Sequence, residues 1–351
     1  MRKYYLILSL LISVTLLSCT ESASLKCDGE NSIYYWRTTF SLNDAEREFL
    51  QKHSVNKVYM RFFDVDVSYD MAYGESVVPE ATILFNDSIP EGIEIVPTVY
   101  ITVNAIREMQ LKEKEYARKI FNRVSAICRQ NNIELRELQL DCDWTKRTRD
   151  YFFRLCKEVK QCMDSTQVVS STIRLHQLTQ TAPPVDKGVL MVYNTGNLME
   201  MSADNSIFSQ KDIEPYLRDN RLADYPLTLD VAYPSYGWSL VFDHREDTYS
   251  FNRIMRRTDF STFPELKEIS PNLYEVTTNV NFLEYEDGND YVFIGDRVRV
   301  ERPTAEEILK IKRMIDAQLE GKDHNNILYH LDEEQLSHYT DNEISKIYSR
   351  N

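Results

Sequence analysis

The chain has 351 residues, with 55 Asp and Glu against 41 Lys and Arg, and a formal net charge of −14. Its basic residues occur singly or in small pairs such as Arg256-Arg257, which excludes a nucleic-acid partner that needs clustered cations. After an amino-terminal segment, about 330 residues remain, enough for one large α/β barrel or two ordinary domains.

The amino terminus predicts a targeting segment. Arg2 and Lys3 precede an apolar run from Tyr4 to Leu17, which is too short for a membrane span. The next motif, Leu16-Leu17-Ser18-Cys19, resembles a bacterial lipobox and implies a signal peptide over 1–19 with lipidation of Cys19.

A polar tether over 20–30 then leads to the folded part, 31–351. We expect a lipoprotein of the cell envelope, at the outer membrane on its periplasmic or exposed side, attached by the lipid on Cys19 alone. The alternative is an ordinary secretory signal with cleavage nearby.

Alternation of apolar and polar residues predicts eight strands. They are Ile33–Thr39, Lys57–Val65, Ile93–Thr102, Glu137–Asp143, Val168–His176, Val189–Asn194, Leu227–Tyr233 and Asn326–Asp332. Helical patterns between and after them are Leu42–His53, Ala105–Gln130, Arg147–Met163, Lys211–Asp219, Thr304–Leu319 and Asp332–Tyr348. Eight alternating units indicate a single closed (β/α)8 TIM barrel. The alternative, an open doubly wound sheet, lacks a glycine-rich phosphate turn after its first strand.

The longest interruption is an insertion over 237–302, after the seventh strand. It contains strand patterns at Leu273–Tyr285 and Tyr291–Val300, joined by the hairpin turn Asp287-Gly288-Asn289. We expect a lid or wall on the catalytic face of the barrel rather than a second domain.

The fourth strand carries the strongest functional signal. In Leu138-Gln139-Leu140-Asp141-Cys142-Asp143-Trp144, alternation places Asp141 and Asp143 on one face, and an aromatic residue follows. The same argument applied to the other strands predicts a charged lumen: Arg61, Asp141, Asp143, Arg174, His176, Asp230, His330 and Asp332. In the eighth strand, the same alternation turns Tyr329 outward. In the second strand, it turns Asp64 and Asp66 away from the lumen, unless that strand ends before them.

Such a lumen differs from the usual packing of Val, Ile and Leu. Buried charges are costly, so they indicate function or a complete ion-pair network. The network alternative pairs Arg61 with Asp141 and Arg174 with Asp230.

Aromatic residues lie at the predicted strand exits. All three tryptophans, Trp36, Trp144 and Trp238, fall there, and Tyr100, Tyr193, Tyr233 and Tyr236 lie at similar heights. An aromatic rim above carboxylates suits a carbohydrate, whose pyranose faces stack on rings while acids act on the glycosidic oxygen. For any single aromatic, simple packing is the alternative.

At these residues the chain resembles glycoside-hydrolase-type TIM barrels, and especially an uncharacterised family of exported bacterial TIM-barrel lipoproteins related to them. The resemblance covers most of the mature chain and is carried by four motifs: Tyr34-Tyr35-Trp36-Arg37, Arg61-Phe62-Phe63-Asp64, Gln139-Leu140-Asp141-Cys142-Asp143 and Val192-Tyr193-Asn194-Thr195-Gly196. It supports the fold more than the activity, because barrels host many chemistries.

The resemblance also implies catalytic positions. It places an acid on the fourth strand and a second carboxylate on the seventh, which Asp141 or Asp143 and Asp230 would occupy as Asp where Glu is usual. In the chitinase-like D-x-x-D-x-D-x-E motif, Leu138 and Thr145 replace the first and last acids, and that last Glu is the family's proton donor.

We expect a carbohydrate-directed site and prefer an enzyme, narrowly, over three alternatives. A lipid-anchored glycosidase would use Asp143 as general acid, its pKa raised by Asp141, with Asp230 or Asp332 as nucleophile or base. Its sugar contacts would be Trp36, Arg61, Tyr100, Trp144, Arg174, His176, Tyr193, Asn194, Tyr233, Trp238, His330 and Asp332.

The alternatives are an inactive glycan-binding barrel, a metal-dependent hydrolase and a structural envelope lipoprotein. His176, His330, Asp141 and Asp230 would be the metal ligands, but no metal-ligand spacing accompanies them, so we expect no metal and no cofactor.

Overall fold

The computed structural model describes residues 31–68, 76–282 and 291–350. Eight parallel strands form a closed barrel. They are β1 (Asn31–Tyr35), β3 (Val55–Val67), β6 (Glu94–Ile101), β7 (Glu137–Asp141), β8 (Val168–Arg174), β9 (Lys187–Met191), β10 (Thr228–Pro234) and β18 (Asn326–Tyr329). The order is β1-β18-β10-β9-β8-β7-β6-β3, and pairing of β1 with β3 closes the ring. The expected TIM barrel is confirmed.

The predicted signal peptide, Cys19, the tether over 20–30 and the turn at 287–289 lie outside the described residues. Two small additions flank the barrel. The strand β4 (Val77–Glu80) extends β3 antiparallel, and β2 (Thr39–Phe40) pairs with β5 (Leu84–Phe85).

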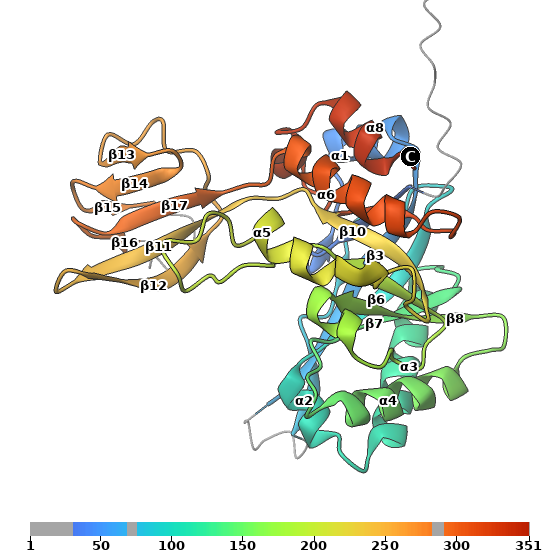
Figure 1. The fold of residues 1–351 in the computed structure, drawn as a ribbon. Helices are drawn as coiled ribbons and strands as arrows, with labels where there is room; N and C mark the ends of the chain where they lie inside the picture. Colours follow the sequence, from blue (N-terminus) through green and yellow to red (C-terminus); the bar gives the residue numbers. More distant parts are fainter. Residues whose placement is uncertain (1–30, 69–75, 283–290, 351) are drawn as a thin grey trace, which may run out of the picture.

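Helices cover the outside of the barrel (Figure 1). They are α1 (Asp44–Lys52), α2 (Val103–Glu108), α3 (Glu113–Gln130), α4 (Arg149–Cys162), α5 (Gln210–Ile213), α6 (Ala305–Gln318), α7 (Glu333–Leu336) and α8 (Asp341–Tyr348), with 3-10 turns at Leu175–Thr179, Glu214–Tyr216 and Arg218–Asn220. Thr304 and Glu307 form a capping box at the start of α6. The helix predicted over Ala105–Gln130 is split, because Leu111 has a left-handed φ of 67° between α2 and α3. Among the described helices, none has both the length and the apolar character to cross a membrane.

The insertion forms a separate sheet that projects from the barrel (Figure 1). Its strands are β11 (Trp238–Arg245), β12 (Thr248–Met255), β13 (Leu266–Ser270), β14 (Leu273–Val276) and β17 (Arg297–Glu301), in the order β12-β11-β17-β14-β13. A short pair, β15 (Val280–Asn281) with β16 (Tyr291–Val292), lies within the predicted hairpin. The β11–β12 hairpin was not predicted. The sheet has its own apolar cluster, which includes Val241, Phe260 and Phe282.

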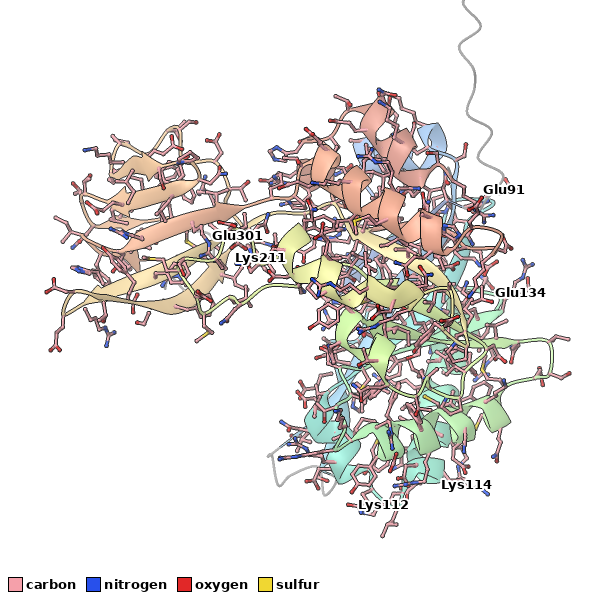
Figure 2. The ribbon with its side chains drawn as sticks, in the orientation of Figure 1. Glu91, Lys112, Lys114, Glu134, Lys211 and Glu301 are labelled. Carbon is pink, nitrogen blue, oxygen red and sulfur yellow. The ribbon has the colours of Figure 1, made fainter. Side chains whose placement is uncertain are left out.

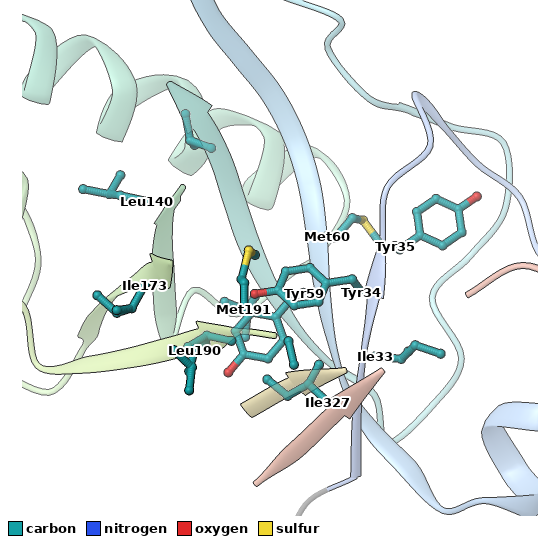
Figure 3. Packing of buried hydrophobic residues seen from close by; sticks show 14 of the residues in the cluster. Ile33, Tyr34, Tyr35, Tyr59, Met60, Leu140, Ile173, Leu190, Met191 and Ile327 are labelled. Carbon is teal, nitrogen blue, oxygen red and sulfur yellow. The ribbon is translucent and has the colours of Figure 1, made fainter. Parts of the chain in front are cut away.

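Inside the barrel, aromatic and amide side chains form a middle layer. The rings of Tyr34 and Tyr59 lie 5.1 Å apart between their centroids, and both residues are fully buried (Figure 3). The Tyr34 hydroxyl donates to Gln139 Oε1 at 2.9 Å, and Thr98 donates to the same oxygen at 3.2 Å. This layer fills the lumen and separates its two ends.

Charged side chains close the amino end of the barrel below that layer. Lys187 Nζ lies 2.7 Å from Asp230 and 3.6 Å from Glu137, and Lys57 Nζ lies 3.3 Å from Glu94 and 3.8 Å from Glu137. Because Asp230, Glu137 and Lys57 are buried, their charges require these partners. A structural ion-pair network thus exists, with pairings other than those the sequence indicated.

Candidate functional site

The carboxyl end of the barrel gathers two aspartates around one arginine. Asp141, the last residue of β7, is 3% exposed and accepts a hydrogen bond from Thr172 Oγ1 at 2.6 Å. Arg174, the last residue of β8, donates from Nε to Asp143 Oδ1 at 2.5 Å, and its Nη2 lies 3.9 Å from Asp141 Oδ1. Gln177 accepts from the Arg174 backbone N–H at 2.9 Å, which fixes the arginine in place. Asp141 and Arg174 therefore share the lumen face as expected, and Thr172 lies with them.

A third aspartate enters the same end through an irregularity in β3. Pairing with β6 shifts between Arg61 and Phe63, so Phe62 is an extra residue in the strand. This bulge reverses the alternation, and Asp64 then lies beside Arg61, whose Nε donates to it at 2.7 Å. The alternation had required the strand to end before Asp64. In the structure β3 continues to Val67. A bulge leaves no signal in the apolar pattern, so sequence reasoning missed Asp64.

Aromatic rings form a continuous group next to these charges. Tyr329 is the centre: its ring lies 5.9 Å from Trp36, 4.8 Å from Tyr193 and 5.5 Å from Tyr236 between centroids. Trp238 contacts Tyr236 edge-on at 5.5 Å. Trp36, Tyr329 and Trp238 are partly exposed, so the group presents aromatic surface to solvent.

A cavity of about 280 Å³ opens beside the Arg174–Asp143 pair. Its lining is Asp143, Arg174, Leu175, His176, Met191, Tyr193, Asn194, Thr195 and Tyr216. None of these residues belongs to the inserted sheet. We had expected the insertion to form a lid or wall on this face, but its described residues do not line this cavity. A larger cavity, of about 880 Å³, lies at the amino end and includes Glu94 and Glu134. Figure 2 shows Glu134 on the opposite side of the barrel from Glu301, which lies where the inserted sheet begins.

Burial sets the electrostatics of the site. It raises the pKa of Asp141 to about 6, with a further increase from Asp143, while Arg174 and the Thr172 hydroxyl act in the opposite direction. Burial and both aspartates raise the pKa of Tyr100 to about 12. The pKa of His176 is lowered by burial, although Asp143 partly offsets this. Burial therefore leaves Asp141 as a carboxyl group whose pKa, about 6, lies well above the usual value for an aspartate.

The expected position of Asp230 at this mouth is wrong. Asp230 faces the lumen as predicted, but it lies at the amino end, where Lys187 and the Asn325 backbone N–H hold its carboxylate. Glu137, which shares the cation of Lys187 with Asp230, precedes Asp141 by four residues in β7. Four residues correspond to a rise of about 13 Å along the strand. Alternation gives the face of a strand but not the height that results from barrel shear.

Two expected sugar contacts are enclosed instead. Trp144 is fully buried and packs edge-on against Phe153 at 5.3 Å. Tyr233 is fully buried on the outer face of β10, near enough to Asp316 of α6 for that carboxylate to raise its pKa, after burial itself. Trp144 and Tyr233 therefore present no ring to a ligand at the mouth.

The predicted parity of the last strand is also wrong. β18 ends at Tyr329, and its pairing of Ile327 with Ser32 turns Tyr329 inward rather than outward. Asp332 lies beyond the strand and caps α7 by accepting from the Gln335 backbone N–H at 3.1 Å. His330 lies beside Tyr236 and Tyr329, and the enclosure of its ring lowers its pKa to about 4.

The position of the chitinase-type proton donor holds no acid. Thr145 is exposed in the turn before α4, where its backbone N–H donates to Thr148 Oγ1 at 2.9 Å. Over residues 31–68, 76–282 and 291–350, no three His, Cys, Asp or Glu side chains gather in a metal-binding arrangement. His176 and His330 lie apart, the first in the cavity lining and the second behind the aromatic group.

Comparison with known proteins identifies the fold. No family model and no curated protein matches the sequence. The structure is similar to a chitinase from Chromobacterium violaceum, at 11% identity and a TM-score of 0.54, covering 91% of this chain and 97% of that one. The spore cortex-lytic enzyme SleL of Bacillus cereus is also similar, at 12% identity and a TM-score of 0.50, covering 91% of this chain and 74% of that one. SleL of Bacillus megaterium is similar at 14% identity and a TM-score of 0.50, covering 88% of this chain and 72% of that one. The chain therefore has the fold of glycoside-hydrolase-related TIM barrels.

Proposed function

We propose that the carboxyl-end mouth of the barrel binds a carbohydrate chain. The observation that carries this proposal is one continuous aromatic group whose member Tyr193 lines an open cavity together with Arg174 and Asp143. In the same group, Trp36 and Tyr329 are partly exposed. Sugar rings have apolar faces that pack on aromatic surfaces and hydroxyls that bond to charged groups, so both kinds of group are needed side by side. The similar folds of a chitinase and of cortex-lytic enzymes are consistent with this class of ligand.

Binding without hydrolysis is the form of the proposal that the geometry favours. Thr145 holds the position of the proton donor, Asp143 is paired with Arg174, and Asp230 lies at the other end of the barrel. A glycosidase with its two carboxyl groups on either side of a glycosidic bond needs them about 5–9.5 Å apart at one opening. The pair expected from the sequence does not meet this condition.

Hydrolysis is the second candidate, favoured by the pKa of Asp141 near 6. A carboxyl group with that pKa suits a general acid, and Asp64 replaces Asp230 as the second carboxylate at the mouth. The Asp141→Asn variant decides between the candidates: loss of measured glycan cleavage supports hydrolysis, and unchanged binding with no cleavage in either protein supports a binding barrel.

The binding proposal is tested with the purified mature chain, carrying Cys19→Ser, against N-acetylglucosamine tetramer and soluble peptidoglycan fragments in a calorimeter. Trp36→Ala should weaken binding about tenfold or more, since truncating an aromatic ring that packs on a ligand has that effect. Tyr291→Ala is the matched control, because this aromatic residue is 50% exposed in β16 of the insertion and does not line the cavity. Equal loss in both variants, or no binding by the wild type across a wider glycan panel, refutes the proposal.

We further propose that the protein is exported and that a lipid on Cys19 holds it at the cell envelope, on the support of its lipobox-like motif. The wild type should partition into detergent after expression in a bacterium, and Cys19→Ser should remain in the aqueous phase. Detergent partitioning of both proteins alike would contradict this anchor.

A further inference from the structure

A buried acid in the inserted sheet contacts both the sheet's root and a loop of the barrel. Glu301, at the end of β17, is 1% exposed. Its Oε1 accepts from Arg299 Nε at 2.9 Å, and its Oε2 accepts from Trp238 Nε1 at 2.8 Å and from the hydroxyl of Ser206. Figure 2 shows Glu301 at the junction of sheet and barrel. Three segments distant in sequence thus converge on one carboxylate.

The ion pair of Arg299 and Glu301 holds the loop that follows β9. Arg299 Nη1 donates to the carbonyls of Glu200 at 2.8 Å and Met201 at 2.6 Å. In the same loop, the Gly196 backbone N–H donates to the Ser206 carbonyl at 3.0 Å, so the contact of Ser206 with Glu301 reaches the start of the loop. That start is Asn194 and Thr195, which line the cavity.

A second route runs through aromatic rings. Trp238, held by Glu301, contacts Tyr236 at 5.5 Å, and the Tyr236 hydroxyl donates to Asn194 Oδ1 at 2.6 Å. Asn194 has a left-handed φ of 54°, a conformation that needs support from its surroundings. Both routes from Glu301 therefore end at the same wall of the cavity.

We propose that Glu301 is a positioning residue: through Ser206 and through Trp238 and Tyr236, it sets the place of Asn194 in the cavity wall and thereby the affinity for ligand. The part that concerns ligand rests on the proposed carbohydrate binding. The inserted sheet then acts on the cavity without lining it. A glutamine at this position would not keep these contacts, since both Glu301 oxygens accept from donors and a glutamine amide offers one acceptor oxygen only.

The test combines Glu301→Gln with Tyr236→Phe in a double-mutant cycle, read by calorimetric titration of N-acetylglucosamine tetramer. Glu301→Gln alone should weaken binding roughly three- to thirtyfold, the range of coupling through connected networks. In the Tyr236→Phe background the effect of Glu301→Gln should shrink below about threefold. Equal losses in both backgrounds would show that Glu301 does not act on Asn194 through Trp238 and Tyr236, and would overturn the proposal as stated.

Hydrogen exchange of the apo protein separates this inference from the proposed function. Amides over 193–209 should exchange faster in Glu301→Gln than in Glu275→Gln, a matched control on β14 whose carboxylate is 41% exposed and 3.9 Å from Arg297. The same rates in both variants overturn the inference even if the wild type binds the tetramer. Faster exchange supports it even if the wild type does not bind. If Glu301→Gln does not fold, Ser206→Ala, which removes one contact only, replaces it in both measurements.

Discussion

Replacing Asp141 by Asn should change how stability depends on pH. Burial raises the pKa of Asp141 to about 6, whereas an aspartate in the unfolded chain titrates near 3.9. The folded protein therefore binds more protons than the unfolded chain between these values, and its free energy of unfolding falls as pH rises from about 4 through 6. The ionised carboxylate costs the folded state about 3 kcal/mol at pH 7, and no exposure reduces this because Asp141 is 3% exposed.

The amide that this substitution introduces would keep an oxygen that accepts from Thr172 but would have no proton to lose. The unfolding free energy of Asp141→Asn minus that of the wild type should therefore rise by about 2 kcal/mol between pH 4 and 7. Urea unfolding, followed by tryptophan fluorescence at half-unit pH steps, measures it. The control Asp219→Asn makes the same chemical change at a carboxylate that is 83% exposed. A difference for Asp141→Asn that stays constant across this range would refute the argument from burial.

Further predictions concern the two ends of the barrel. Trp144→Ala should destabilise the fold by about 3–5 kcal/mol in urea unfolding, because it empties a fully buried site beside Phe153. Its glycan affinity at pH 7 should stay within about twofold of wild type. A large loss of affinity without destabilisation would place this ring at the ligand. Lys187→Met should cost about 3–5 kcal/mol, since it leaves Asp230 and Glu137 without their shared cation. Unchanged stability of Lys187→Met would show that these carboxylates do not depend on that cation.

The fold was predictable because its signals are local. Each barrel strand alternates or runs apolar over four or more residues, and capping residues such as Asn43 and Thr304 mark the starts of helices where the structure has them. The charged lumen was predictable for the same reason, because Asp141, Thr172 and Arg174 follow the period of their strands.

The site was less predictable because it depends on how strands shift against one another. Asp230 faces inward, yet register places it at the amino end, and the Phe62 bulge brings in Asp64 against the parity of its strand. The early end of β18 moves Asp332 into a helix cap. None of these features changes the composition or period of a segment, so one sequence does not reveal them.

The filled middle of the barrel limits how any ligand approaches. Tyr34, Tyr59 and Gln139 fill the interior, and the ion pairs of Lys57 and Lys187 lie beneath them. The opening at the carboxyl end therefore does not continue through the barrel. A polymer has no passage from one end to the other, so it would rest across the rim on Trp36 and Tyr329 or insert a terminus only. Longer chains would then gain affinity from contacts outside the opening, and not from depth.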